Sequence, residues 1–179
     1  MSWQESRYKI YEKQYPYFAT GTVIQWLPLF SNPEVVNYIL DSWVFMQEHH
    51  RLTIYAYVIM ENHLHMVVSS DNLSKELGDF KSYTARQIID YYKRKGSKFI
   101  LSALSHGKQA FKRGREYQFW QEGSHPQQMR TRKIMTQKIE YIHYNPIRRG
   151  YVDDPVHWRY SSARDYVHGS GLIPVCTGW

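Results

Sequence analysis

The chain has 179 residues, of which 42% are hydrophobic and 22% charged. These values fit one globular domain over residues 1–179, with residues 1–13 as a polar, flexible arm. The apolar runs are strand-sized, no secretory signal is recognisable, and the one cysteine excludes an internal disulfide framework. Membrane and disulfide-rich secreted proteins are therefore excluded, and a reducing, cytoplasmic location is expected.

Positive charge is concentrated in the middle of the chain. The net charge is +7, and residues 86–149 alone carry fifteen Lys and Arg against four Asp and Glu. Residues 1–85 and 150–179 are slightly acidic in comparison. Such segregation favours a polyanionic partner, although a basic cluster can also be a solvated surface. Because aromatic residues reach 16%, and unpaired bases stack on aromatic rings, nucleic acid is the favoured partner.

The first half of the chain predicts a strand, a helix and a hairpin. Residues 17–26 are rich in β-branched and aromatic side chains, as strands are. An Asn-Pro pair at 32–33 starts a helix, which apolar residues at helical spacing extend to about residue 48. Residues 52–60 are apolar throughout and predict a central strand, with residues 63–69 as its hairpin partner.

The second half predicts two more helices and one more strand. A helix is expected over residues 74–96, capped by its first serine and ended by its glycine. Residues 97–116 are basic and give no clear pattern, whereas residues 117–122 alternate like a short strand. A last helix is expected over residues 131–144, because the following Asn145-Pro146 pair disfavours helical geometry.

The resulting order of elements is β-α-β-β-α-β-α. Its first six elements match the ferredoxin-like split βαβ arrangement of the α+β class. We therefore expect an antiparallel sheet of four to five strands with helices on one face, and an extra C-terminal helix.

Two histidines share one face of the strand predicted over residues 63–69. Side chains alternate along a strand, so His63 and His65 point to one side while Leu64, Met66 and Val68 anchor the other side in the core. Two imidazoles about 7 Å apart along a strand can bind one divalent ion. By itself such a pair is more often surface or satisfied core than a metal site.

A second pair of functional side chains lies in the last predicted helix. Tyr141 and Asn145 are four residues apart and so project from one face. Tyr141 offers a nucleophilic oxygen, and the Asn145 carbonyl can complete a metal shell with the two histidines. This mixed set suits Mg²⁺ or Mn²⁺, with the nitrogen ligands favouring Mn²⁺. The alternative is that Tyr141 is ordinary packing; its neighbours His143 and Tyr144 face elsewhere and are interpreted as non-catalytic.

Three sequence blocks resemble one known family. The run 60–68, Met-Glu-Asn-His-Leu-His-Met-Val-Val, is similar to the histidine-hydrophobe-histidine (HUH) signature of insertion-sequence-200-like, single-tyrosine transposases. The run 119–126, Phe-Trp-Gln-Glu-Gly-Ser-His-Pro, is similar to a second block of that family. The runs 141–152 and 158–163 resemble the branch called REP-associated tyrosine transposases. The blocks lie in the expected order over residues 17–166.

The resemblance implies a ferredoxin-like fold and metal-dependent cleavage and rejoining of single-stranded DNA through a 5′-phosphotyrosine, at hairpin-forming sequences. It implies that His63 and His65 bind metal, that Tyr141 is the nucleophile, and that Asn145 is a third ligand. Where the family often has Pro-Asn before the first histidine, this chain has Glu61-Asn62, and Glu61 could add a carboxylate near the metal or shape the turn. A homodimer could decide whether the site forms within one chain or between two.

Further residues are candidates for supporting roles. Lys138 could favour the phenolate of Tyr141, or be a solvated helix lysine. Base stacking is assigned to Tyr91, Tyr92, Phe119 or Trp120, although alternation predicts that one of the last two is core. Phosphate contacts are assigned to the basic stretch. Its candidates are Arg94, Lys95, Lys98, Lys112, Arg113, Arg115, Arg130, Arg132, Lys133, Arg148 and Arg149.

Two other functions fit the same residues. One is a protein of the same fold that binds DNA hairpins without cutting them; retention of His63, His65, Tyr141 and Asn145 argues against it. The other is a metallohydrolase in which His63, His65 and Glu61 activate water and Tyr141 has no role. An assay that follows both cleavage and a covalent protein–DNA adduct separates the three possibilities. The tyrosine nuclease cleaves and forms an adduct, the metallohydrolase cleaves without one, and the hairpin-binding protein does neither. With DNA as the partner, the expected cytoplasmic location is nucleoid-associated.

Overall fold

The computed structural model describes residues 15–108, 114, 116–123 and 126–179. The expected arm, residues 1–13, lies outside the described residues. The elements are β1 (Tyr17–Thr22), α1 (Pro33–Glu48), β2 (Thr53–Ile59), β3 (His63–Ser69), α2 (Leu73–Arg94), α3 (Lys98–His106), β4 (Gln127–Gln128), α4 (Arg132–Arg148) and α5 (Ala163–His168), with short 3₁₀ turns at Ile24–Trp26, Leu29–Ser31 and Pro155–His157. None of the described helices is long and apolar enough to cross a membrane.

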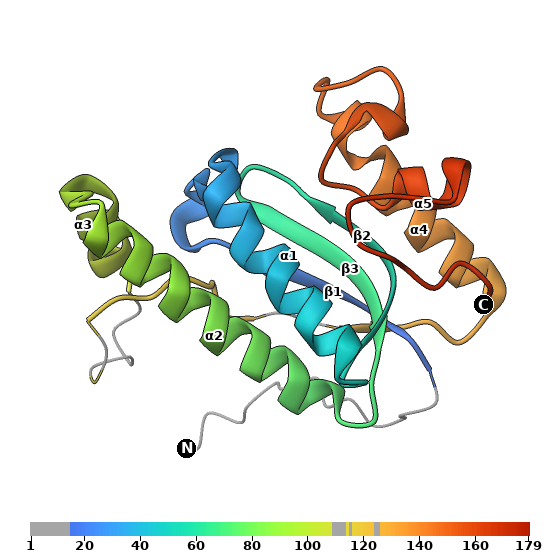
Figure 1. The fold of residues 1–179 in the computed structure, drawn as a ribbon, viewed down its shortest axis with the longest axis horizontal. Helices are drawn as coiled ribbons and strands as arrows, with labels where there is room; N and C mark the ends of the chain where they lie inside the picture. Colours follow the sequence, from blue (N-terminus) through green and yellow to red (C-terminus); the bar gives the residue numbers. More distant parts are fainter. Residues whose placement is uncertain (1–14, 109–113, 115, 124–125) are drawn as a thin grey trace, which may run out of the picture.

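The sheet has four antiparallel strands in the order β2-β3-β1-β4 (Figure 1). This confirms the expected α+β class and the β2–β3 hairpin. The expectation that β2 is central is wrong, because β2 lies at an edge. The C-terminal segment covers that edge: the Ile59 amide donates to the Tyr160 carbonyl at 2.8 Å, and the Cys176 amide donates to the Ile54 carbonyl at 2.8 Å. Covered on its edge as well as its faces, β2 is as apolar as a central strand.

Helices cover both faces of the sheet. On one face, α1 and α2 pack against Leu64, Met66 and Val68 of β3, as alternation predicts. On the other face, Ile139 and Ile142 of α4 pack against a second cluster that includes Val67. The extra C-terminal helix therefore lies on the face opposite α1 and α2. His63 and His65 lie four and two residues before Val67 on the same strand, so their side chains point to the same face as Val67, toward α4.

Two helix boundaries follow side-chain caps. Helix α1 begins and ends as predicted, and the Asn32 carboxamide accepts from the Glu34 amide at 3.0 Å. Helix α2 begins one residue before the predicted Ser74, because the side chain of Asn72 accepts from the Lys75 amide. The unassigned basic stretch contains a helix that the sequence did not predict, α3.

Residues 117–122 do not form the expected fourth strand. Only Trp120 makes an isolated bridge, to Val23, and the fourth strand of the sheet is the two-residue β4. Phe119 and Trp120 are both buried in the core between the sheet and α2. The alternation of apolar and polar residues was therefore misleading, since consecutive aromatic side chains enter the same core.

Helix α4 continues past Pro146, contrary to expectation. It ends at Arg148, and Gly150, two residues further on, has a φ of +73°. There the Gly150 amide donates to the Ile147 carbonyl at 2.8 Å, and the Tyr151 amide donates to the Pro146 carbonyl at 3.0 Å. This pairing is a Schellman cap, in which glycine supplies the left-handed residue. As a result Tyr141, Asn145 and the following arginines lie on one continuous helix.

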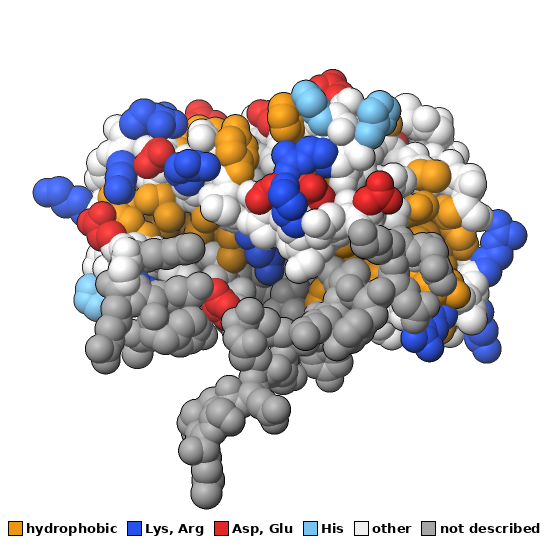
Figure 2. Space-filling view, turned by 90° about the horizontal axis from the view of Figure 1, so that it is seen from below, with side chains coloured by type: hydrophobic (Ala, Val, Ile, Leu, Met, Phe, Trp, Pro, Cys, Tyr) orange, Lys and Arg blue, Asp and Glu red, His pale blue; other side chains and the backbone are white. Residues whose placement is uncertain are grey.

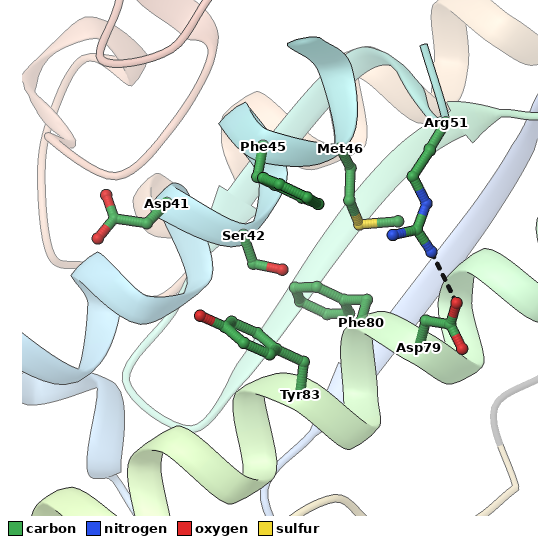
Figure 3. A pocket seen from close by; sticks show the side chains of 8 residues that line it. All are labelled: Asp41, Ser42, Phe45, Met46, Arg51, Asp79, Phe80 and Tyr83. Carbon is green, nitrogen blue, oxygen red and sulfur yellow. Dashed lines mark hydrogen bonds and ion pairs between the residues drawn. The ribbon is translucent and has the colours of Figure 1, made fainter. Parts of the chain in front are cut away.

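A cleft of about 380 Å³ opens between α1 and α2. Figure 3 shows Phe45 and Met46 of α1 facing Phe80 and Tyr83 of α2, with Arg51 bound to an acidic side chain at the rim. Both helices lie on the face of the sheet opposite the one to which His63 and His65 point. The cleft is therefore separate from the candidate site.

A buried histidine on α4 ties the helix to the edge strand. The His143 Nε2 lies 2.9 Å from the Ser162 hydroxyl, which accepts from the Tyr57 amide at 2.9 Å. Burial lowers the pKa of His143 to about 4. His143 thus acts as a neutral hydrogen-bonding core residue, in line with its non-catalytic interpretation.

Acid is expected to weaken the fold through His143. The pKa of His143 is lower in the folded protein than in the unfolded chain, because burial disfavours the charged ring. The contribution of His143 to the free energy of unfolding is therefore complete above the unfolded pKa of about 6.5, and it is lost as the pH falls toward 4. Between pH 7.5 and 5 the loss is about 2 kcal/mol. Urea unfolding of wild type and His143→Gln at both pH values measures it. The variant should lose about 2 kcal/mol less than wild type; equal losses would contradict the assignment.

Candidate active site

Strand β3 brings the two predicted metal-binding histidines together. The rings of His63 and His65 have centroids 4.9 Å apart at an interplanar angle of 72°. Both side chains are buried, with 4% and 7% of their surface exposed. Two buried imidazoles at this spacing need hydrogen-bond partners or a metal, because unsatisfied polar groups are costly in a protein interior.

Each histidine uses its Nδ1 atom in a hydrogen bond. The His63 Nδ1 lies 2.7 Å from the Asn62 Oδ1, and the His65 Nδ1 lies 2.8 Å from the Thr20 hydroxyl. Thr20 is paired with His65 across the β1–β3 ladder, so strand register places it there. The Asn62 oxygen can only accept, so the His63 Nδ1 donates to it and the Nε2 lone pair remains for a metal. The Thr20 hydroxyl can accept from the His65 Nδ1 in the same way, and in that tautomer the His65 Nε2 is likewise available.

The protein holds both imidazoles in the form that binds metal. Burial lowers the pKa of His63, and the positive charge of Arg149 adds to this effect. Burial lowers the pKa of His65 to about 3, with a smaller effect of His63. Both rings are therefore neutral near pH 7, which leaves their lone pairs free without loss of a proton.

Helix α4 places Tyr141 beside this pair within a single chain. The Tyr141 ring lies 5.4 Å from the His65 ring, centroid to centroid. Phe18 of β1 fixes both rings, because it stacks on His65 at 5.2 Å and meets Tyr141 edge-on at 5.9 Å. Tyr141 is itself only partly buried, so its ring remains open to solvent on one side.

Two cationic side chains flank the tyrosine. The Lys138 Nζ lies 5.6 Å from the centre of the Tyr141 ring, and the Arg148 guanidinium lies 5.1 Å from it. The Lys138 Nζ also lies 4.8 Å from the Phe18 ring centre. Asn145 follows Tyr141 by one helical turn and is buried, with 7% of its surface exposed. The helix thus places the Tyr141 ring and two positive charges near His65, and carries the buried Asn145 one turn further along.

Glu61, in the turn before His63, is paired with Arg149. Its Oε1 accepts from the Arg149 guanidinium at 2.9 Å. Its Oε2 is buried and has no hydrogen-bond partner among the described residues. A buried carboxylate oxygen without a partner is costly, and it is the kind of atom that a cation or an ordered water satisfies.

The donor set fits an open divalent-metal site. Among the described residues, no three His, Cys, Asp or Glu side chains converge on one point. Glu61 therefore does not join the two histidines in such a group, and the two Nε2 atoms would need oxygens from Asn145 or a substrate to complete a shell. A site with few protein ligands and open positions is typical of catalysis rather than of structural metal binding.

The basic residues assigned to phosphate contacts fall into three exposed groups. Lys112, Arg113 and Arg115 lie outside the described residues, and the other eight divide by position. Arg94, Lys95 and Lys98 lie where α2 meets α3, Arg130, Arg132 and Lys133 where α4 begins, and Arg148 and Arg149 where it ends. On the face that Figure 2 presents, Lys and Arg side chains likewise stand apart, with acidic side chains between groups. Of the eight described residues, Arg148 contacts the Tyr141 ring and Arg149 binds Glu61.

The aromatic residues proposed for base stacking are unsuited to that role. Tyr91, Tyr92, Phe119 and Trp120 are all buried, with at most 8% of each exposed. Sequence reasoning also missed Thr20 and Phe18, which orient His65 from the neighbouring strand. Thr20 and Phe18 are two residues apart in β1, so the sequence does predict that they share one face of the sheet. That this is the face of His65 follows only from the register in which β1 pairs with β3.

Comparison with known proteins agrees with the sequence resemblance. No protein-family model matches the chain. A curated protein of Haemophilus influenzae, whose name assigns it provisionally to the REP-associated tyrosine transposases, is 25% identical over 133 residues, covering 72% of this chain and 69% of that protein. A solved structure of a REP-associated tyrosine transposase bound to a REP hairpin matches the fold with a TM-score of 0.68 and 18% identity, covering 98% of this chain and 90% of that one.

Proposed function

We propose that this chain, which resembles the REP-associated tyrosine transposases in sequence and in fold, cleaves and rejoins single-stranded DNA through Tyr141. The observation that carries the proposal is the position of the Tyr141 ring, 5.4 Å from the ring of His65 in a pair of buried, neutral histidines. A nucleophile beside a metal-binding pair is the arrangement that phosphoryl transfer needs.

In the cleavage step, the Tyr141 oxygen attacks the phosphorus of the scissile phosphodiester. A new phosphorus–oxygen bond forms to the tyrosine while the bond to the 3′-oxygen breaks. The phenol loses its proton to solvent, and the departing 3′-oxygen takes one up. The products are a 5′-phosphotyrosine and a free 3′-hydroxyl, which can attack in the reverse direction. Because one phosphodiester is exchanged for another, rejoining needs no ATP.

A divalent ion would bind at the His63 and His65 Nε2 atoms, with Asn145 of α4 as an oxygen donor. Glu61, whose Oε2 has no hydrogen-bond partner among the described residues, would support the site from the turn before His63. Such an ion, Mg²⁺ or Mn²⁺, withdraws charge from the non-bridging oxygens of a phosphate. The surrounding residues do the positioning. Phe18 and Thr20 hold His65, and Lys138 and Arg148 provide positive charge beside Tyr141.

The substrate is proposed to be a single strand that carries a hairpin. The similar fold whose solved structure is bound to a REP hairpin supports this choice. Arg148 and Arg149 at the end of α4 are positioned for phosphates near the scissile bond. The groups at the α2–α3 junction and at the start of α4 are available for the rest of the DNA. The position of the Tyr141 ring beside His65 of the same chain supports cleavage within one chain, without a contribution from a second copy.

A labelled-DNA assay tests this function. Hairpin-bearing single strands carrying a label on the 5′ or the 3′ side of the cleavage point are incubated with the protein and Mn²⁺ or Mg²⁺. The proposal expects a denaturation-resistant adduct that retains only the 3′-side label, together with a product whose 3′-hydroxyl a polymerase can extend. Cleavage without an adduct would identify the metallohydrolase. Binding without cleavage would identify the hairpin-binding protein. Either result overturns the proposal.

A further inference from the structure

An exposed tryptophan stands at the rim of the candidate site. The Trp26 ring meets the His63 ring edge-on, with centroids 5.8 Å apart and an interplanar angle of 68°. Fifty-three per cent of its surface is exposed, whereas His63 is buried. More than half of the indole surface therefore lies open to solvent beside the histidine pair and is available to a planar ligand.

The backbone that presents Trp26 is strained. Gln25 and Trp26 have φ values of 54° and 56°, in the left-handed region that residues other than glycine seldom adopt. Two consecutive residues in this region persist only where neighbouring structure holds them, and such strain concentrates at functional sites.

Several contacts hold the turn in place. The Val23 amide donates to the Asn62 carbonyl at 2.9 Å, which ties the turn to the residue before His63. The Trp26 amide donates to the Val23 carbonyl at 3.0 Å. The Gln25 side chain packs so closely on Gly107 that a Cβ there would lie 2.9 Å from it. The indole is thus fixed relative to the candidate metal ligands.

The position of the indole suits a nucleobase next to the scissile phosphate. In a single strand, a base follows each phosphate within one nucleotide, and an unpaired base exposes both of its faces. The cations Arg148 and Arg149 offer contacts to the phosphates on the α4 side of the histidines. Trp26, in the turn that follows β1, offers an apolar, planar surface in contact with His63.

We propose that Trp26 stacks on an unpaired nucleobase adjacent to the cleaved phosphodiester and so fixes the register of the strand in the active site. This inference rests on the proposed function. It makes Trp26 a DNA-binding residue that recognises an unstacked base. A base held in a duplex presents no free face, so the stack selects single-stranded DNA at the cleavage point.

Binding measured without cleavage tests the stack. Fluorescence anisotropy in EDTA gives the affinity of wild type, Trp26→Ala and Trp26→Phe for a hairpin with a single-stranded flank. We expect Trp26→Ala to bind about 10-fold more weakly, as loss of one base stack does, and Trp26→Phe to recover most of the affinity. For the same hairpin without its flank, all three proteins should bind equally. Phe45→Ala, an equally exposed aromatic on α1, is the matched control and should bind like wild type.

A second readout locates the stacked base. 2-Aminopurine, which loses fluorescence on stacking, is placed in turn at each flank position. One position next to the cleavage point should be quenched by wild type and not by Trp26→Ala. Unchanged affinity of a folded Trp26→Ala variant, or no such position, overturns the inference even where wild type forms the covalent adduct. Wild type that binds no single strand overturns the proposed function as well.

Discussion

A Tyr141→Phe variant is expected to form no covalent adduct and to lose strand transfer by about 10³-fold or more, while its affinity for hairpin DNA stays that of wild type. Phenylalanine keeps the ring contacts with Phe18 and His65 and the positions of Lys138 and Arg148 beside it. It removes only the oxygen that would attack phosphorus. A loss of activity without a loss of binding would therefore belong to the chemical step.

The matched control is Tyr144→Phe. Tyr144 is on the same helix, one turn from Tyr141, and 49% of its surface is exposed. The control loses the same atom from the same residue type, so it should keep both the adduct and the transfer. The measurement is the yield of adduct on a denaturing gel together with the Kd for the hairpin. An adduct formed by Tyr141→Phe, or one lost equally in Tyr144→Phe, would contradict the nucleophile assignment.

The parts of the fold that the sequence predicted well are those set by local periodicity. Helix α1 has the predicted start and end because Asn32 caps it and its apolar stripe is unbroken. Strand β3 has the predicted limits, and its two-residue alternation placed His63 and His65 together on one face. Both features depend on neighbours a few residues away, which a sequence displays directly.

The errors occurred where distant contacts override local preference. Pro146 disfavours a helix locally, yet α4 continues because its buried face packs on the sheet and Gly150 provides a better end. Strand β2 has the composition of a central strand because the C-terminal segment, more than a hundred residues later, covers its edge. Neither contact could be inferred from residues nearby in the sequence.

The candidate site likewise combines local features that the sequence shows with contacts between distant segments that it does not show. The spacing of Tyr141 and Asn145 on one helix was visible in the sequence, and so was the histidine pair. The sequence could not place that helix against β3 of the same chain, nor supply Thr20 as the acceptor for His65. From the sequence, base stacking was predicted for four aromatic residues that are buried in the structure, and Trp26 was not considered. The exposure of Trp26 depends on the strained turn at Gln25 and Trp26, which the sequence does not reveal.

The second large effect is expected at His65. A His65→Asn variant keeps a hydrogen-bonding group near the Nδ1 position, facing Thr20, but lacks the Nε2 atom. We expect its affinity for Mn²⁺ to fall by more than about 100-fold and the adduct to disappear with it, because one of only two imidazoles in the candidate site is lost. Titration of the DNA-free protein with Mn²⁺, followed by electron paramagnetic resonance near pH 7.5, measures the affinity without any cleavage.

A Thr20→Val variant tests whether Thr20 of β1 orients the His65 ring. Valine has nearly the shape of threonine but cannot accept from the His65 Nδ1, so the ring loses the partner that presents Nε2 to the metal. The affinity for Mn²⁺ should fall by about 10- to 100-fold, less than in His65→Asn. His143→Gln is the control, since it changes a buried histidine outside the site and should bind Mn²⁺ like wild type. If all three variants kept wild-type affinity, the ion would bind elsewhere and the metal assignment of the histidine pair would be wrong.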